Sequence, residues 1–264
     1  MRHHLHLPWK DLNLSVSLDY PPSYSSDKGT AFPIVIICHG FIGSKVGVNR
    51  LFVKACDALN ELGYVLIRFD YAGCGESEGD YGSNTLDGFI DQTKAVLNFA
   101  KTLSCVDPSS ITLIGHSLGG AVATLASLKE PDVKRLILWS PVGNPSKDIC
   151  EIIQKGSNNL YDYQGYCISE AFITSLEDHQ PIELCPFFLG DVLIIHGEAD
   201  EEIPVQYATQ YANAFNTRTN GNCQLYTIKE ANHTYSSTTT YQELITITKQ
   251  WVMERALEKS ELRA

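Results

Sequence analysis

The run Gly115-His116-Ser117-Leu118-Gly119 has the residue types and spacing that a serine nucleophile requires. It follows the apolar run Ile111–Ile114 and precedes the small-residue run Gly120–Ala126, a pattern that predicts strand, sharp turn and helix. Glycine on both sides leaves room for a serine in a strained turn. The hydroxyl would then lie at the positive end of a helix, where a developing oxyanion is stabilised. We therefore interpret Ser117 as a nucleophile rather than a structural turn residue.

Two further residues have the types that would activate such a serine. A hydroxyl needs a base to accept its proton and an acid to orient that base. Asp200 follows the apolar run Val192–Ile195, and His233 follows the weaker run Leu225–Ile228. All three side chains are thus expected just past the carboxyl ends of parallel strands, where α/β sheets bind ligands. Three nearby carboxylates compete with Asp200 for the role of acid: Glu198, Glu201 and Glu202.

An oxyanion hole is expected from an earlier strand-to-helix loop. His39-Gly40-Phe41 follows the apolar run Ile34–Cys38, and we assign the backbone N–H groups of Phe41 and Leu118 as its donors. Gly40 allows the main chain to approach the substrate closely. The remaining candidates have simpler interpretations: His39 and His196 as buried packing and hydrogen-bonding residues, His116 as pointing away from the elbow, His179 as solvated, Asp70 as a hydrogen-bonding turn residue, and His3, His4 and His6 on an exposed terminal strand.

Apolar, largely β-branched runs alternate with helical patterns along the chain, which predicts a mostly parallel sheet covered on both faces. Leu12–Leu18 alternates apolar and polar residues and predicts a half-exposed strand in an antiparallel start. Between Trp139 and Val192 the alternation stops for about fifty residues, which favours an inserted subdomain over a long loop. Strands are expected at 34–38, 64–69, 111–114, 136–139, 192–195 and 225–228, and helices at 51–62, 86–103, 117–128, 205–215 and 241–257.

Composition narrows the classes of partner. The net charge of −11 argues against nucleic acid or an anionic membrane as the main partner. We find no apolar run long enough to span a bilayer and no signal-peptide segment, so a cytoplasmic protein is expected. The 8 scattered cysteines are expected to be free thiols. We expect a small-molecule substrate and no metal or cofactor, and leave a homodimer open.

Together these motifs resemble the α/β-hydrolase superfamily of serine hydrolases, and within it bacterial cinnamoyl/feruloyl esterases and related cytosolic carboxylesterases. The resemblance implies a mostly parallel eight-stranded sheet formed by 1–142 and 191–264, with a small cap at 143–190. The matching residues are His39-Gly40-Phe41, Arg68-Phe69-Asp70-Tyr71-Ala72-Gly73-Cys74-Gly75-Glu76-Ser77, Gly115-His116-Ser117-Leu118-Gly119-Gly120, His196-Gly197-Glu198-Ala199-Asp200 and Asn232-His233.

The expected reaction is hydrolysis of short-chain or aromatic acyl esters through an acyl-enzyme. Tyr161, Tyr163 and Tyr166 of the cap either line an acyl or aromatic pocket or only pack the cap. Thioesters, amides and short peptides are alternative substrates for the same three residues. A hydrolase fold that only binds ligands is an alternative of another class, although such proteins usually lose a member of the triad.

Overall fold

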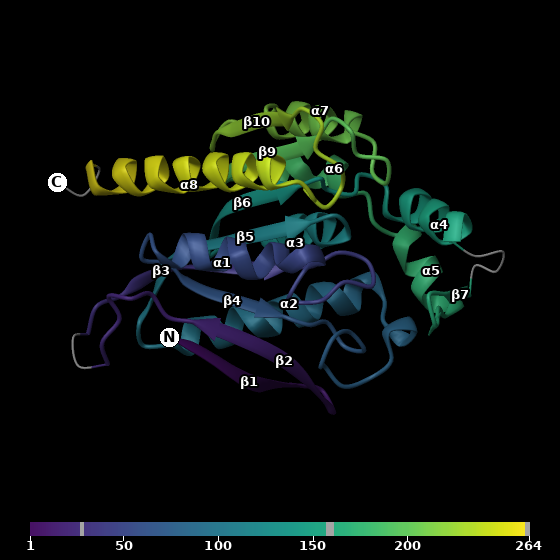
Figure 1. Cartoon of the computed structure of the whole chain (residues 1–264), viewed down its shortest axis with the longest axis horizontal. Helices are drawn as coiled ribbons and strands as arrows, with labels where there is room; N and C mark the ends of the chain where they lie inside the picture. The colour runs from purple at the N-terminus through teal and green to yellow at the C-terminus, as the bar shows by residue number, and fades with distance from the viewer. Residues whose placement is uncertain (27–28, 157–160, 262–264) are drawn as a thin grey trace.

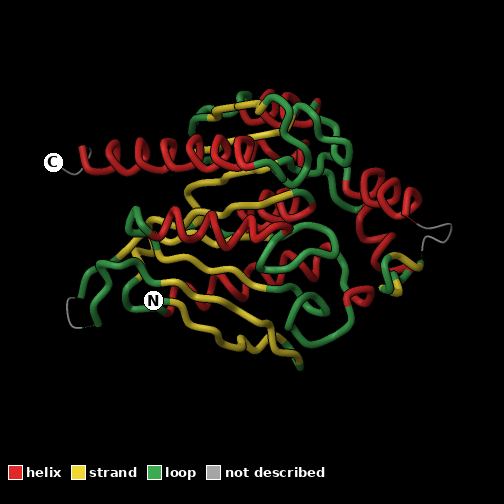
Figure 2. Tube along the Cα trace, in the orientation of Figure 1, coloured by secondary structure: helices red, strands yellow, loops and turns green. Residues whose placement is uncertain are grey.

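The protein is built on an eight-stranded sheet with the order β1-β2-β4-β3-β5-β6-β9-β10 (Figures 1 and 2). The computed structural model describes residues 1–26, 29–156 and 161–261. β2 runs antiparallel to β1 and β4, and the other neighbours pair in parallel, which confirms the predicted sheet. The strands are β1 (Arg2–Trp9), β2 (Leu12–Asp19), β3 (Phe32–Cys38), β4 (Val65–Phe69), β5 (Val106–His116), β6 (Val133–Trp139), β9 (Asp191–Gly197) and β10 (Cys223–Ile228).

Helices cover both faces of this sheet, as the continuous apolar strands require. In Figure 1, α1 and α8 lie in front of the sheet and α2 and α3 behind it. Strand residues of either orientation are therefore buried; Ile34, Val35 and Ile36 of β3 are all 0% exposed. The helices flanking the sheet are α1 (Leu51–Asn60), α2 (Leu86–Thr102), α3 (Leu118–Lys129), α7 (Gln206–Phe215) and α8 (Thr238–Glu261), with 3₁₀ turns η1 (Val48–Arg50) and η2 (Tyr81–Ser83).

The prediction of a half-exposed strand at Leu12–Leu18 is wrong. Ser15 and Ser17 of β2 are only 5% and 1% exposed, so both faces of the strand are covered. The Ser15 N–H donates to Ser77 Oγ at 2.7 Å, and Ser17 Oγ lies 3.1 Å from His4 Nδ1. The polar half of the alternation thus marks buried, hydrogen-bonded serines rather than a solvated face.

The 143–190 segment contains short elements instead of an extended loop. Figure 1 shows α4, α5 and β7 projecting past the carboxyl ends of the strands. Phe172 of α5 is 0% exposed and lies 6.0 Å from Phe89 of α2 between ring centroids, so the segment is packed on the core. Its described elements are α4 (Pro145–Gly156), β7 (Asp162–Tyr163), β8 (Tyr166–Cys167), α5 (Glu170–Glu177), α6 (Pro181–Leu184) and η3 (Cys185–Phe187).

His179 of this segment is not solvated as expected. Its side chain is 15% exposed, and Nε2 lies 3.3 Å from a carboxylate oxygen of Asp87 at the start of α2. The contact between His179 and Asp87 attaches the 143–190 segment to the core. The sequence could not indicate it, because the two residues lie far apart in the chain.

Two expectations from composition can be compared with the structure. All eight cysteines are free thiols, as predicted, and five of them are buried, namely Cys38, Cys56, Cys74, Cys105 and Cys185. Over the described ranges, no helix combines the length and apolar character that crossing a bilayer requires.

Candidate active site

Ser117 occupies a strained turn between β5 and α3. Its φ and ψ are 59° and −128°, a conformation that costs energy for any residue other than glycine. The Ser117 N–H donates to Trp139 O at 3.0 Å, which fixes the turn against β6. A Cβ on Gly115 would lie 2.3 Å from Gly119 O, and one on Gly119 would lie 2.2 Å from Cys38 O. The glycine spacing is therefore a packing requirement of the elbow.

The predicted acid, Asp200, and the predicted base, His233, meet beyond the carboxyl ends of β9 and β10. Asp200 follows β9, His233 follows β10, and His233 Nδ1 donates to Asp200 Oδ2 at 2.7 Å. This bond leaves Nε2 as the nitrogen that accepts a proton. Burial alone would raise the pKa of Asp200, but hydrogen bonds from His196, His233 and the Ile203 N–H outweigh it and hold the pKa below its usual range. Asp200 is therefore ionised beside His233.

His196 is a neighbour of Asp200 whose contact sequence reasoning missed. It is 0% exposed, as expected of a packing residue. Its Nε2 also lies 3.3 Å from Asp200 Oδ2 and 3.1 Å from Ile203 O. Two histidines, His196 and His233, thus meet the same carboxylate oxygen of Asp200. The available signal was closeness in sequence, since His196 lies at the end of β9 and Asp200 in the turn that follows it.

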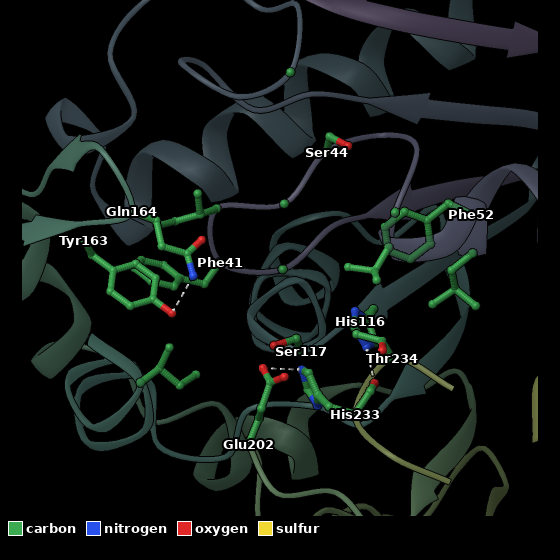
Figure 3. A pocket seen from close by; sticks show the side chains of 18 of the residues that line it. Phe41, Ser44, Phe52, His116, Ser117, Tyr163, Gln164, Glu202, His233 and Thr234 are labelled. Atoms are coloured by element: carbon green, nitrogen blue, oxygen red, sulfur yellow. Dashed lines mark hydrogen bonds and ion pairs between the residues drawn. The ribbon is translucent and has the colours of Figure 1, made fainter. Parts of the chain in front are cut away.

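Ser117 and His233 line one cavity, but the described contacts include no hydrogen bond between Ser117 Oγ and His233. His233 Nε2 instead faces Glu202, whose Oε2 is 3.9 Å away (Figure 3). A serine hydroxyl can rotate about its Cα–Cβ bond, and contacts of this kind commonly tighten only when substrate binds. In the described part of the structure, Ser117 and His233 therefore line the same cavity without a hydrogen bond between them.

The backbone of the loop after β3 lies directly against Ser117. A Cβ on Gly40 would be 2.8 Å from Ser117 Cβ, so only glycine permits this approach. The Tyr71 N–H donates to His39 Nε2 at 3.1 Å, which leaves His39 Nδ1 to donate to Gly40 O at 2.9 Å. Because the peptide is trans, holding the Gly40 carbonyl aims the Phe41 N–H the opposite way. Burial lowers the pKa of His39 to about 4, so this arrangement is neutral at pH 7.

A buried ion pair supports the same loop. Lys45 Nζ lies 2.5 Å from Asp70 Oδ2, and the Lys45 N–H also donates to Asp70. Arg68 donates to Lys45 O at 2.8 Å, which attaches the loop to β4. The structure thus gives Asp70 the hydrogen-bonding turn role that we expected of it. Lys45 is the partner that the sequence did not indicate, because it lies 25 residues away.

Leu118, the other predicted oxyanion donor, begins α3 and is 2% exposed. Its N–H lies at the helix N-terminus, where backbone donors have no partner within the helix. Phe41 lies in a turn, and over the described ranges its N–H donates no hydrogen bond. Both amides thus have the local setting that the oxyanion assignment requires.

His116 does not point away from the elbow, so that expectation is wrong. Its Nε2 donates to His233 O at 2.8 Å, and the two rings lie 4.8 Å apart between centroids. Burial, and then the proximity of His233, lower the pKa of His116 to about 3. His116 is therefore a neutral donor that holds the His233 loop. The direction of its side chain depends on a loop 117 residues later in the chain.

Because the pKa of His116 is lower in the folded than in the unfolded chain, acid should destabilise the protein. Between about pH 6.5 and 3 the unfolded state binds the additional proton, so this contribution is lost as the pH falls. At pH 5 we expect a loss of about 2 kcal/mol from this histidine. Urea unfolding at pH 7.5 and 5 should therefore show a smaller loss for His116→Gln than for wild type.

His6→Gln, on the exposed edge strand β1, is the matched control and should behave as wild type. An equal loss of unfolding free energy in His116→Gln and wild type would contradict the prediction.

The cavity around Ser117 has a volume of about 810 Å³. Tyr163 and Tyr166 are among the residues that line it, together with Phe41 and Gln164 (Figure 3), and their contact with a substrate stays a prediction. Tyr161 is 44% exposed and is not among the lining residues, so the structure does not support its predicted contact with substrate. It precedes the β7–β8 hairpin, whose two strands carry the other tyrosines toward the site.

Fold and site together define a serine hydrolase of the α/β-hydrolase superfamily. A family profile described as serine aminopeptidase, S33, matches residues 29–161, half of the chain, and the chain belongs to this family. Among solved structures, Est1E from Butyrivibrio proteoclasticus with ferulic acid bound is similar, with a TM-score of 0.80 and 26% identity over 96% of this chain and 99% of that one. The resemblance inferred from the motifs is thereby confirmed.

Curated relatives are similar over shorter stretches. A mouse protein, palmitoyl-protein thioesterase ABHD10, mitochondrial, is 30% identical over 210 residues, 72% of this chain and 66% of the relative. An uncharacterized 31.7 kDa protein of Escherichia coli is 35% identical over 105 residues. That match covers 40% of this chain and only 36% of the relative's length. These comparisons support hydrolase activity.

Proposed function

We propose that the protein hydrolyses carboxylic esters through an acyl-enzyme formed on Ser117. The observation that carries this proposal is the 2.7 Å bond between His233 and Asp200, beside a serine in a strained elbow. In this function Ser117 is the nucleophile, His233 the base, and Asp200 the acid that fixes its tautomer. The N–H groups of Phe41 and Leu118 bind the oxyanion.

The proposed reaction has two halves that balance. Ser117 Oγ bonds to the ester carbonyl carbon as its proton passes to His233 Nε2. The bond from that carbon to the alcohol oxygen then breaks, and Nε2 returns the proton to the alcohol. Water next attacks the acyl carbon, giving one proton to His233, and Ser117 Oγ leaves and takes that proton back. An ester and a water thus become an acid and an alcohol.

We propose that the 143–190 segment is a cap and that its hairpin shapes the acyl side of the site. Phe41 lies 5.7 Å from Tyr163 between ring centroids, and Tyr166 lies 5.6 Å from Tyr81. Aromatic side chains offer a large apolar surface, and an aromatic acyl group could pack against it in an offset or edge-to-face arrangement. The ferulic acid bound in Est1E supports an aromatic acyl group for this chain as well.

A thioester is the second candidate substrate class. The mouse relative named as a palmitoyl-protein thioesterase favours it. The same residues would act on a thioester without change, because the acyl-enzyme is identical and only the leaving atom differs.

The test compares p-nitrophenyl butyrate, S-ethyl thiobutyrate and alanine p-nitroanilide as substrates of the wild-type protein. We expect the highest kcat/KM for the ester, with a fluorophosphonate probe labelling Ser117. The probe is necessary because it reports the nucleophile independently of substrate choice. If no ester is turned over and Ser117 is not labelled, the protein is a binding protein with a hydrolase fold.

A further inference from the structure

The cavity continues on the side of Ser117 that faces away from the cap. In Figure 3, Phe41, Tyr163 and Gln164 lie to one side of Ser117, and Phe52, His116 and Thr234 lie to the other. We call this second region the α1-side lobe. Its lining residues are Val48, Leu51, Phe52, His116 and Thr234.

The position of His233 indicates which half of an ester this lobe would receive. The proton returned to the alcohol comes from His233, so the leaving group must lie beside that ring. The His116 ring is tilted by 35° against the His233 ring, with 4.8 Å between their centroids. The Phe52 ring lies 5.9 Å from His116 between centroids, and Thr234 follows His233 in the chain. Resting on the proposed ester hydrolysis, we propose that the α1-side lobe binds the alcohol half and selects an uncharged, apolar alcohol.

The chemistry of the lobe fits an apolar group. Of the three apolar residues that line the lobe, Val48 exposes the most carbon surface, at 56%, whereas Leu51 and Phe52 are each only 2% exposed. Gly47 has φ of 72°, and a Cβ there would lie 2.8 Å from the Phe52 ring, so the turn packs directly on the aromatic face. His116 is held by its bond to His233 O and is neutral. Burying an alkyl or phenyl group against these side chains is favourable.

The charges around the cavity disfavour an anionic leaving group. Among its described lining residues none is lysine or arginine, whereas Glu201 and Glu202 are both present. Glu202 Oε2 lies 3.9 Å from His233 Nε2, close to where the alcohol oxygen would leave. A carboxylate or phosphate on the alcohol would therefore meet like charge with no compensating cation.

Val48 provides the test, because it lines the lobe yet is 56% exposed and tolerates a larger residue. With the butyryl group constant, we compare kcat/KM for methyl, butyl and benzyl esters. Val48→Phe should lower the value for benzyl butyrate about tenfold while leaving methyl butyrate within about twofold. Hydrolysis of the acyl-enzyme should be unchanged, since the alcohol has already left. Val48→Leu should lower kcat/KM less than Val48→Phe does, and again more for benzyl butyrate than for methyl butyrate.

Two control variants separate this effect from general damage. Val46→Phe adds the same bulk in the same loop at a residue outside the cavity lining, and should match wild type with every ester. Ile152→Phe narrows the opposite side, on α4, so its effect should follow the size of the acyl group.

The charge of the alcohol is tested with a substrate of nearly the same shape. Wild type should hydrolyse 4-carboxybenzyl butyrate about tenfold more slowly than benzyl butyrate. The double variant Glu201→Gln, Glu202→Gln should bring the rates for 4-carboxybenzyl butyrate and benzyl butyrate closer together, because it removes the two negative charges of the cavity lining. Equal rates for the two esters in wild type would overturn the selection against charge.

Loss of selectivity and loss of the proposed function give different results. If wild type hydrolyses none of the esters and Ser117 resists the fluorophosphonate probe, the proposed function fails. If esters are hydrolysed but Val48→Phe lowers kcat/KM equally for all of them, or for none, the α1-side lobe does not bind the alcohol.

Discussion

Replacing Ser117 with alanine is expected to lower kcat for p-nitrophenyl butyrate by about a millionfold, the scale found when a serine nucleophile is removed. Among the residues that the structure describes, no other hydroxyl shares its setting, a strained turn that joins a strand to a helix N-terminus beside His233. Steady-state turnover of the purified variant is the measurement. Circular dichroism spectra that match those of wild type would show that the fold is intact. Turnover near the wild-type level would reject Ser117 as the nucleophile.

Ser117→Gly adds an independent readout of the elbow. With φ of 59°, the wild-type turn is strained for serine and for alanine but not for glycine. The glycine variant should be as inactive as the alanine variant and more stable by about 1 kcal/mol, measured by urea unfolding. If the two variants are equally stable, strain at this residue is not stored in the folded state.

The second large effect is expected for Asp200→Asn, which should lower kcat by about ten thousandfold. The amide keeps the shape of the side chain but removes the charge that fixes His233 with its proton on Nδ1. It also removes the group that stabilises the imidazolium during proton transfer. The assay is again hydrolysis of p-nitrophenyl butyrate, at saturating substrate.

Glu202→Gln is the matched control for Asp200→Asn. Glu202 is also an acid near His233, but its carboxylate is 55% exposed and lies 3.9 Å from Nε2, on the side of the ring opposite to Asp200. We expect a change smaller than about tenfold, because an exposed charge is screened by water. A larger loss in Glu202→Gln than in Asp200→Asn would assign the acid to Glu202.

The sheet and the predicted catalytic residues were accessible from sequence because local patterns determine them. Runs such as Ile34–Cys38 are apolar on both faces, so they predict parallel strands without knowledge of their neighbours. Asp200 and His233 could be chosen because each follows such a run, and the carboxyl ends of parallel strands share an edge. The glycines beside Ser117 report steric contacts within the elbow itself.

The features that sequence reasoning missed depend on contacts between distant segments. His116 was misjudged because its partner is a carbonyl in the His233 loop, which no local pattern places. β7 and β8 have only two residues each, too few for a period to be recognised. The alternation of apolar residues and serines in β2 predicts a solvated face, but the serines are buried. The same alternation occurs whether the polar residues face water or a loop that forms hydrogen bonds with the strand.

The site has two parts, the residues at the strand ends and the segments that form the walls of the cavity, and this division has an evolutionary consequence. The predicted triad and the Gly40–Phe41 peptide are fixed by the sheet, by His39 and by the elbow glycines, so mutations there are expected to be purged. The walls come from the turn at Val48 and from the β7–β8 hairpin, whose partly exposed residues contribute little to stability. Descendants of this sequence can therefore acquire new substrate ranges by neutral drift in the walls while the chemistry stays constant.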